Sequence, residues 1–318
     1  MKRKIRQILI AYRELKRDFK STGNAEFKKS HIEADIIRLV HSIEKGLCLE
    51  NSRKGFGVIK IKTLFSLCER YLSLNSDDFD CLYFVLDGVK EYLDFHKKEN
   101  FENDDILEIK GKYEKLKEKM PERDDVYGGV NQVSLSDMEF DIDEIEKLFN
   151  TRHSVREFSG EPVDEETLRK AIKLAQRCPS ACNRQGVRVY SVSSEKFLAD
   201  VEESLDGIGG FAQDVDKFLI ITGKQSAYKL EEKNQYIVSA SIFAAYLTLA
   251  LHTYNIAACM IQRSLIPRSY WTKFRMKNKI LADEQIVMLI GVGKYKDKTK
   301  VPMSKRFDID KIYRNLQE

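Results

Sequence analysis

The stretch from Tyr236 to Gln262 constrains the fold most, because it contains no Asp, Glu, Lys or Arg. It is long enough to cross a bilayer, but polar residues interrupt it, and Asn255 predicts a turn after about Tyr254. A helix that is apolar on nearly every face is buried in a large core or in an interface. We therefore expect a helix that is buried in a core or an interface, then an extended stretch from Ile256, and no stable insertion into a membrane.

The composition is that of a globular protein. Hydrophobic residues make up 42% of the 318 residues, which is enough for a core, and the net charge of +4 predicts no nucleic-acid partner. The six cysteines include no CxxC pair, and the five histidines have no metal-ligand spacing. The apolar run after the basic N-terminus is too short for a secretory signal. We therefore expect a cytoplasmic protein with reduced thiols and no metal site.

The first 120 residues are predicted to form an all-helical region, because apolar residues recur there at helical spacing. The expected helices cover residues 1–20, 30–48, 58–73, 77–98 and about 104–119. The polar, glycine-punctuated stretch 41–57 is either a connection between helices or a functional loop. The turn-rich stretch 121–140 predicts a linker, and residues 141–318 a second domain.

Residues 1–20 combine eight Lys and Arg residues with only Glu14 and Asp18 as acids. Their apolar residues form a stripe along one helical face, made of Ile5, Leu9, Tyr12, Leu15 and Phe19. Such a helix can lie on an anionic membrane. Amphipathic helices more often face a protein core, so we expect the stripe to pack on the rest of the N-terminal region.

Arg152, Ser154 and Arg156 stand at alternate positions. In an extended backbone these three side chains point to one side, and His153 and Val155 point to the other. Two guanidiniums and a hydroxyl on one side suit a phosphate, because the arginine fork matches phosphate oxygens. A solvated basic loop is the alternative interpretation.

A capped helix and a polar turn follow this basic segment. Asp164 is expected to cap the helix, and Pro179 to prevent its continuation. In the turn that comes next, Asn183 and Gln185 carry amide donors and acceptors. A ring whose edge alternates C=O and N–H groups needs partners of that kind.

Four features follow one another within residues 152–185: the motif Arg-x-Ser-x-Arg, a Pro-Val pair, the capped helix and the motif Pro-Ser-x-x-Asn-x-Gln. Their order and spacing resemble the opening of the FMN-dependent nitroreductase family, and a weaker likeness extends over about 145–312. The resemblance implies an α+β fold with a mostly antiparallel central sheet flanked by helices, here preceded by the all-helical N-terminal region. It also implies a homodimer with the uncharged helix at its centre.

The same resemblance implies FMN as the cofactor. The implied FMN-binding residues are Arg152, His153, Ser154, Arg156, Pro179, Ser180, Ala181, Asn183, Gln185, Ile261, Gln262, Lys305 and Arg306. The chain departs from many family members at Gly186 and Val187, where they have Pro and an aromatic residue. Cys182, beside Asn183, is expected to be a small packed residue, and a reactive thiol near the flavin is the alternative.

The resemblance further implies an NAD(P)H-dependent FMN oxidoreductase. Such an enzyme transfers hydride by a ping-pong mechanism, from NADH or NADPH to the flavin and then to a nitroaromatic, a quinone or a similar acceptor, without a catalytic protein residue. Two alternatives stay open. One is a dedicated flavoenzyme for a specialised substrate, linked to surface-polysaccharide biosynthesis, with the helical region as a lid. The other is a non-catalytic flavin-binding interaction protein.

Overall fold

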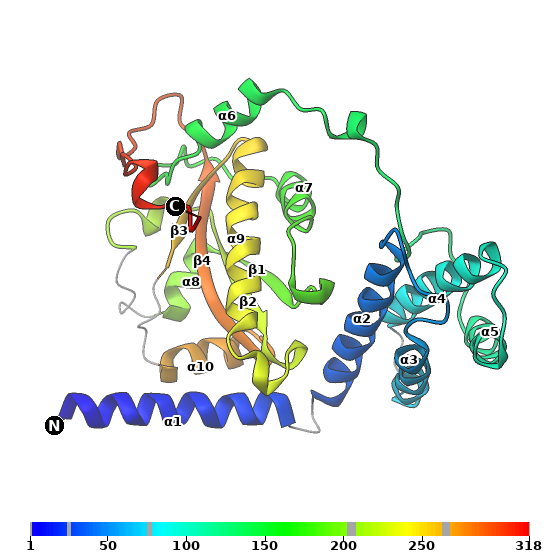
Figure 1. Cartoon of the computed structure of the whole chain (residues 1–318). Helices are drawn as coiled ribbons and strands as arrows, with labels where there is room; N and C mark the ends of the chain where they lie inside the picture. The colour runs from blue at the N-terminus through cyan, green and yellow to red at the C-terminus, as the bar shows by residue number, and fades with distance from the viewer. Residues whose placement is uncertain (1, 24–26, 75–77, 202–207, 263–267, 318) are drawn as a thin grey trace.

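The chain folds into a helical N-terminal part and an α+β C-terminal part (Figure 1). The computed structural model describes residues 2–23, 27–74, 78–201, 208–262 and 268–317. The expected fold class is confirmed, because helices are followed by an antiparallel sheet that has helices on both faces.

The described N-terminal residues form helices, and all of these but the first pack around one shared core. The helices are α1 (Lys2–Gly23), α2 (Lys28–Leu47), α3 (Val58–Leu72), α4 (Asp80–Lys98) and α5 (Asp104–Lys117). The core lies between α2, α3, α4 and α5, and Ile36, Leu64, Leu82 and Ile109 are completely buried in it. Each of these helices repeats apolar residues every three or four positions, so one face of each turns inward.

Helix α1 lies apart from that core, along the edge of the α+β part (Figure 1). Its C-terminal end is anchored there, because the Ser21 hydroxyl donates to Gln225 Oε1 at 3.1 Å and Gln225 Nε2 donates to Asp18 Oδ1 at 2.7 Å. Its apolar stripe is exposed instead of packed. The expectation that this stripe packs on the N-terminal region is therefore wrong, because α2 to α5 close their core without α1.

The sheet of the C-terminal part has the strand order β1-β2-β4-β3, and all neighbouring strands are antiparallel. The strands are β1 (Val187–Ser193), β2 (Lys217–Lys224), β3 (Ile256–Ile261) and β4 (Glu284–Lys294). Strand β2 is buried at every interior position, which fits its run of branched and aromatic residues between two layers of helices.

Helices cover both faces of the sheet. Helices α7 (Glu165–Ala175) and α9 (Gln235–Thr253) share one core with it. Helix α8 (Ser194–Val201) and Phe274 of α10 (Arg268–Lys277) belong to the core on the opposite face. The sheet is therefore the middle of three layers.

The uncharged helix expected from the sequence is α9. Among the described residues, it is the one helix that is long and apolar enough to cross a membrane by composition, but it packs along the sheet. Ala240, Ala244 and Leu247 are completely buried there. On its other side, Val238 and Tyr246 keep 47% and 44% of their surface exposed.

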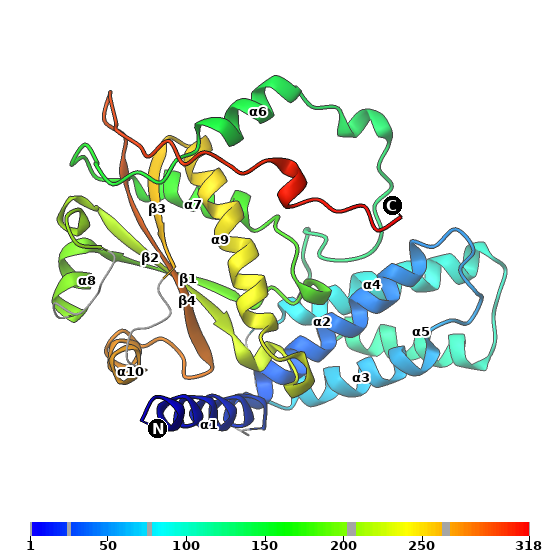
Figure 2. The ribbon, with the colours of Figure 1, turned by 60° about the vertical axis from the view of Figure 1, so that its left-hand side comes forward.

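Two further segments lie outside the cores. Helix α6 (Ile142–Thr151) buries none of its residues, and residues 302–317, with the short helix η7 (Ile309–Lys311), are exposed throughout. Figure 2 shows both segments beside the body that the sheet and its helices form. Both carry large exposed apolar side chains, among them Phe149 and Ile312.

Candidate functional site

The basic segment 152–156 runs along the edge of β3. The Val155 amide donates to the Ala258 carbonyl at 3.0 Å, and the Val155 side chain is buried. Arg152 and Ser154 are half-buried, and Arg156 is exposed. The backbone pairing with β3 thus directs Val155 inward and leaves the two arginines at the surface.

The surroundings of Arg152 and Arg156 are electropositive. Within the described part of the chain, neither guanidinium has a carboxylate within 4.0 Å, and Arg156 donates only to the Ser154 carbonyl at 3.5 Å. His252 at the end of α9 lies close by, with Nε2 2.8 Å from Thr151 Oγ1 and Nδ1 2.9 Å from the Tyr295 hydroxyl. Burial lowers the pKa of His252, and electrostatic repulsion from Arg152 and His153 lowers it further. Two unpaired guanidiniums beside a neutral imidazole can hold an anion.

Ile261 and Gln262 lie at the end of β3, and together with the basic segment 152–156 beside this strand they form one strip of candidate site residues. They come three and four residues after Ala258, which places Ile261 about 10 Å farther along the strand. Ile261 is buried, whereas Gln262 is exposed and its Nε2 lies 3.3 Å from Met260 Sδ. The strip therefore combines the charged side chains of the basic segment with the apolar side chain of Ile261 and the amide of Gln262.

The predicted polar turn follows α7, at the other end of the domain. Asp164 caps the helix as expected, because its carboxylate accepts from the amides of Glu166 and Thr167 at 3.3 and 2.7 Å. In the turn, Pro179, Asn183 and Gln185 are exposed, while Ser180 and Ala181 are half-buried. The Ser180 hydroxyl accepts from the Gln185 amide at 3.1 Å.

The backbone of this turn is left-handed at three residues that are not glycine. The φ angles of Cys182, Asn183 and Gln185 are 54°, 53° and 50°. Such conformations cost about 1–3 kcal/mol each and persist only where the surroundings enforce them. The constraint comes from the residue between them, Arg184.

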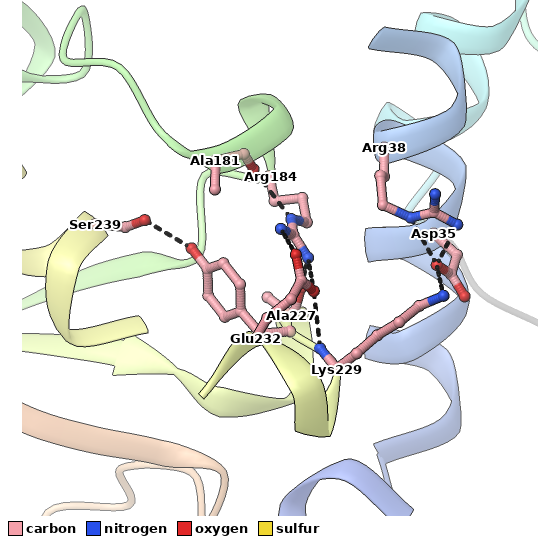
Figure 3. A network of polar contacts seen from close by, with 9 residues as sticks. Asp35, Arg38, Ala181, Arg184, Ala227, Lys229, Glu232 and Ser239 are labelled. Atoms are coloured by element: carbon pink, nitrogen blue, oxygen red, sulfur yellow. Dashed lines mark hydrogen bonds and ion pairs between the residues drawn. The ribbon is translucent and has the colours of Figure 1, made fainter. Parts of the chain in front are cut away.

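Arg184 is 6% exposed and anchors the turn from within (Figure 3). Its Nε donates to the Ala181 carbonyl at 3.0 Å, and its Nη1 donates to the Ala227 carbonyl at 3.1 Å. Its two terminal nitrogens bind both carboxylate oxygens of Glu232, at 2.7 and 2.5 Å. Its guanidinium also lies over the Tyr228 ring, 4.5 Å from the ring centre. The side chain therefore joins the turn to the segment after β2.

The same network reaches the N-terminal helical region (Figure 3). Glu232 accepts from the Lys229 amide at 3.0 Å, and Lys229 Nζ lies 3.8 Å from Asp35 of α2. Arg38 Nε, one turn farther along α2, donates to the same Asp35 oxygen at 3.1 Å. Helix α2 thus packs directly beside the polar turn.

A cavity of about 880 Å³ lies between the helical region and the α+β part. One wall comes from α2 and α4, including Glu33, Ile37 and Phe84, and the other from α7, β1 and the polar turn. Ser180 and Gln185 are among its lining residues. The helical region therefore shapes the space beside two of the predicted site residues.

A single chain does not bring the two predicted halves together. Val155 is level with Val292 of β4 through its bond to Ala258, whereas Gly186 pairs with Lys224, which is level with Glu284. Eight residues along β4 separate these positions, which corresponds to about 26 Å, and five residues separate Glu284 from Leu289, the partner of Ile261, which corresponds to about 16 Å. The first of these distances exceeds the reach of one mononucleotide.

Lys305 and Arg306 lie in the exposed C-terminal segment. Arg306 Nη1 donates to the Ser304 carbonyl at 2.5 Å, and both side chains are exposed. Their place beside Arg152 stays a prediction.

Four residues of the site region were not identified from the sequence. His252 and Tyr295 border the basic segment, and Arg184 and Glu232 hold the turn. Arg184 stands at a variable position of the motif, and the other three are far from it in sequence. Only the three-dimensional packing reveals them.

Comparison with known proteins identifies part of the chain. Residues 150–232 match the nitroreductase family, whereas a comparison with curated proteins gave no match. Similar solved structures include an FMN-dependent nitroreductase of Clostridium difficile, with 22% identity, a TM-score of 0.45, and coverage of 53% of this chain and 97% of that one. Another is a nitroreductase family protein of Streptococcus pneumoniae, with 19% identity, a TM-score of 0.45, and coverage of 54% and 99%. The match at residues 150–232 assigns this segment of the chain to the nitroreductase family.

Proposed function

We propose that this chain binds FMN and transfers hydride from NAD(P)H to a small acceptor such as a nitroaromatic or a quinone. The observation that carries the proposal is the pair of guanidiniums of Arg152 and Arg156, which have no carboxylate partner among the described residues, in a segment that runs along β3 and matches the nitroreductase family. The donors fit a phosphate group, and the amide-rich turn fits the polar edge of a flavin ring. A cytoplasmic location and the use of NADP belong to the same proposal.

The chain's own residues would bind and orient the cofactor. Arg152 and Arg156 would neutralise the phosphate, and the Ser154 hydroxyl would donate to it. Asn183 and Gln185 would pair with the polar ring edge, where donors favour the negative charge of the reduced ring. FMN, when bound, supplies the redox chemistry.

The site would be completed by a second copy of the chain. One copy would supply the basic strip on β3, and the other the polar turn, because about 26 Å separate the two within one chain. Exposed apolar side chains on α6, α9 and the C-terminal segment, such as Phe149, Tyr246 and Ile312, would be covered in the dimer. Lys305 and Arg306 of that segment would then complete the phosphate site.

A dedicated flavoenzyme is the second candidate. The cavity beside Ser180 and Gln185 has α2 and α4 as one wall, so the helical region would select the acceptor. Steady-state turnover with menadione and with nitroaromatics tests this alternative. Broad turnover favours the general oxidoreductase. Bound flavin that NADPH reduces, without turnover of these acceptors, favours the dedicated enzyme. Bound flavin that nicotinamides do not reduce indicates an interaction protein.

The decisive experiment is the visible absorption spectrum of the purified protein after addition of FMN and removal of the excess. We expect flavin bands that are released on denaturation. Arg152→Ala with Arg156→Ala should lower FMN affinity at least tenfold, since each charge-assisted hydrogen bond contributes about 1.5–3 kcal/mol. Arg177→Ala, at another exposed arginine of the same domain, is the matched control. A protein that stays colourless would refute the proposal.

A further inference from the structure

The apolar stripe of α1 is exposed from Ile5 to Phe19. Ile5, Ile8, Leu9, Tyr12, Leu15 and Phe19 keep between 44% and 67% of their surface exposed. Spaced three or four residues apart, these side chains lie on one face of the helix. From residue 5 to residue 19 the stripe extends over about 21 Å.

The opposite face of α1 holds the helix on the protein. Asp18 and Ser21 are 8% and 2% exposed and bond to Gln225, and His31 Nε2 lies 2.9 Å from the Ser21 carbonyl. On a helical projection, Ser21 lies about 180° from Tyr12 and about 120° from Leu9, and Asp18 lies about 60° from Leu15 at the border of the stripe. The centre of the anchored face is therefore about 140° from the centre of the stripe, and the stripe stays exposed to solvent.

Basic side chains border the stripe. Residues 1–20 contain eight Lys and Arg residues against two acids. Lys4 flanks one side of the stripe, Arg13 and Lys20 flank the other, and Lys16 lies within it; all four are exposed. Long basic side chains beside a buried apolar face can extend their charges toward phosphate groups.

We propose that α1 binds the surface of an anionic lipid bilayer, with its apolar stripe in the headgroup region. A helix with a basic polar face and one narrow apolar face adsorbs to such a surface without spanning it. The positive charge of α1 is complementary to the negative charge of such a bilayer, because polybasic segments are attracted to anionic lipids. A second copy of this chain is a less suitable partner for the stripe than a bilayer, because pairing of two α1 stripes would bring their basic borders together.

The test is sedimentation of the full-length protein with vesicles. Vesicles of phosphatidylcholine alone are compared with vesicles that also contain phosphatidylglycerol. Binding is expected only with the anionic vesicles, and it should weaken as the salt concentration rises. Lys16→Gln with Lys20→Gln should weaken binding about 25-fold, at roughly fivefold for each charge. Ile8→Asp with Leu15→Asp should abolish it.

Leu107→Asp is the matched control, since Leu107 is 48% exposed on α5, away from the stripe. Circular dichroism of each variant confirms that the fold is retained, as expected for exposed positions. Equal binding to both vesicle types, or unchanged binding of the Ile8→Asp with Leu15→Asp variant, would overturn the proposal. A lower molar mass of that variant in light scattering, with no vesicle binding by the wild type, would assign the stripe to a second copy.

Discussion

At the scale of single residues, Arg184 links a strained turn to the rest of the protein. Three of its neighbours have left-handed backbones, and its guanidinium holds the Ala181 carbonyl and the Glu232 carboxylate. Arg184→Met should lower the free energy of unfolding by about 3 kcal/mol, the low end for a broken buried pair, because Glu232 keeps 31% of its side chain exposed. Urea denaturation near neutral pH measures this change.

The same pair gives this variant a pH signature. The hydrogen bond from Arg184 lowers the pKa of Glu232 from 4.5 to about 2. A carboxylate with a lowered folded-state pKa adds stability that is present above the unfolded-state pKa and lost as pH falls. The stability difference between wild type and Arg184→Met should therefore shrink between pH 4.5 and 2. A constant difference over that range would show that Arg184 acts through packing alone.

His252 gives an effect in the range where imidazole titrates. Burial and electrostatic repulsion from Arg152 and His153 lower its pKa, so the unfolded chain binds protons first as pH falls. Stability should therefore decrease as pH falls from about 7.5 to 5.5, and His252→Gln should reduce that decrease. Burial also lowers the pKa values of His31 and His96, so these two residues should preserve part of the pH dependence of stability in the His252→Gln variant. Urea midpoints at several pH values test this, with His41→Gln as the control.

At the scale of helices and strands, local chemistry was sufficient for prediction wherever it was strong. The Asp164 cap, the buried α9 and the helices of the N-terminal region follow from capping groups and apolar spacing. The environment of the α1 stripe was predicted wrongly, because periodicity shows which side of a helix is apolar and not what covers it. The 26 Å between the predicted half-sites depends on strand register, which the motifs do not contain.

Gly223 marks a contact between two elements that a side chain would disrupt. A Cβ atom there would lie 2.5 Å from the Tyr236 carbonyl oxygen, where the end of β2 meets the start of α9. Gly223→Ala should therefore lower the free energy of unfolding by about 1–3 kcal/mol. Gly111→Ala, in the middle of α5 with nothing within 4 Å of the added atom, should raise it by about 0.5–1 kcal/mol. Thermal denaturation should show a lower melting temperature for Gly223→Ala and a higher one for Gly111→Ala. Equal changes in the melting temperatures of the two variants would contradict the packing argument.

At the scale of the whole molecule, the exposed face of α6 makes the proposed dimer testable. Phe149 and Ile142 keep 60% and 63% of their surface exposed. Phe149→Asp with Ile142→Asp should convert a dimer into a 36.9 kDa monomer, because burial of two charges in an interface is costly. Light scattering reads the mass, and Val126→Asp, at a residue 81% exposed in the linker, should leave it unchanged. A monomeric wild type would rule out the shared site.

The separation of the half-sites along β4 also predicts genetic behaviour. A copy with Arg152→Ala and Arg156→Ala lacks the basic strip, and a copy with Asn183→Ala and Gln185→Ala lacks the polar turn. In a two-fold symmetric dimer, each mixed pair would combine one doubly damaged site with one intact site. Random exchange of subunits would then restore about a quarter of the wild-type activity from two inactive proteins. Two damaged alleles in one cell would complement each other, and neither would do so alone.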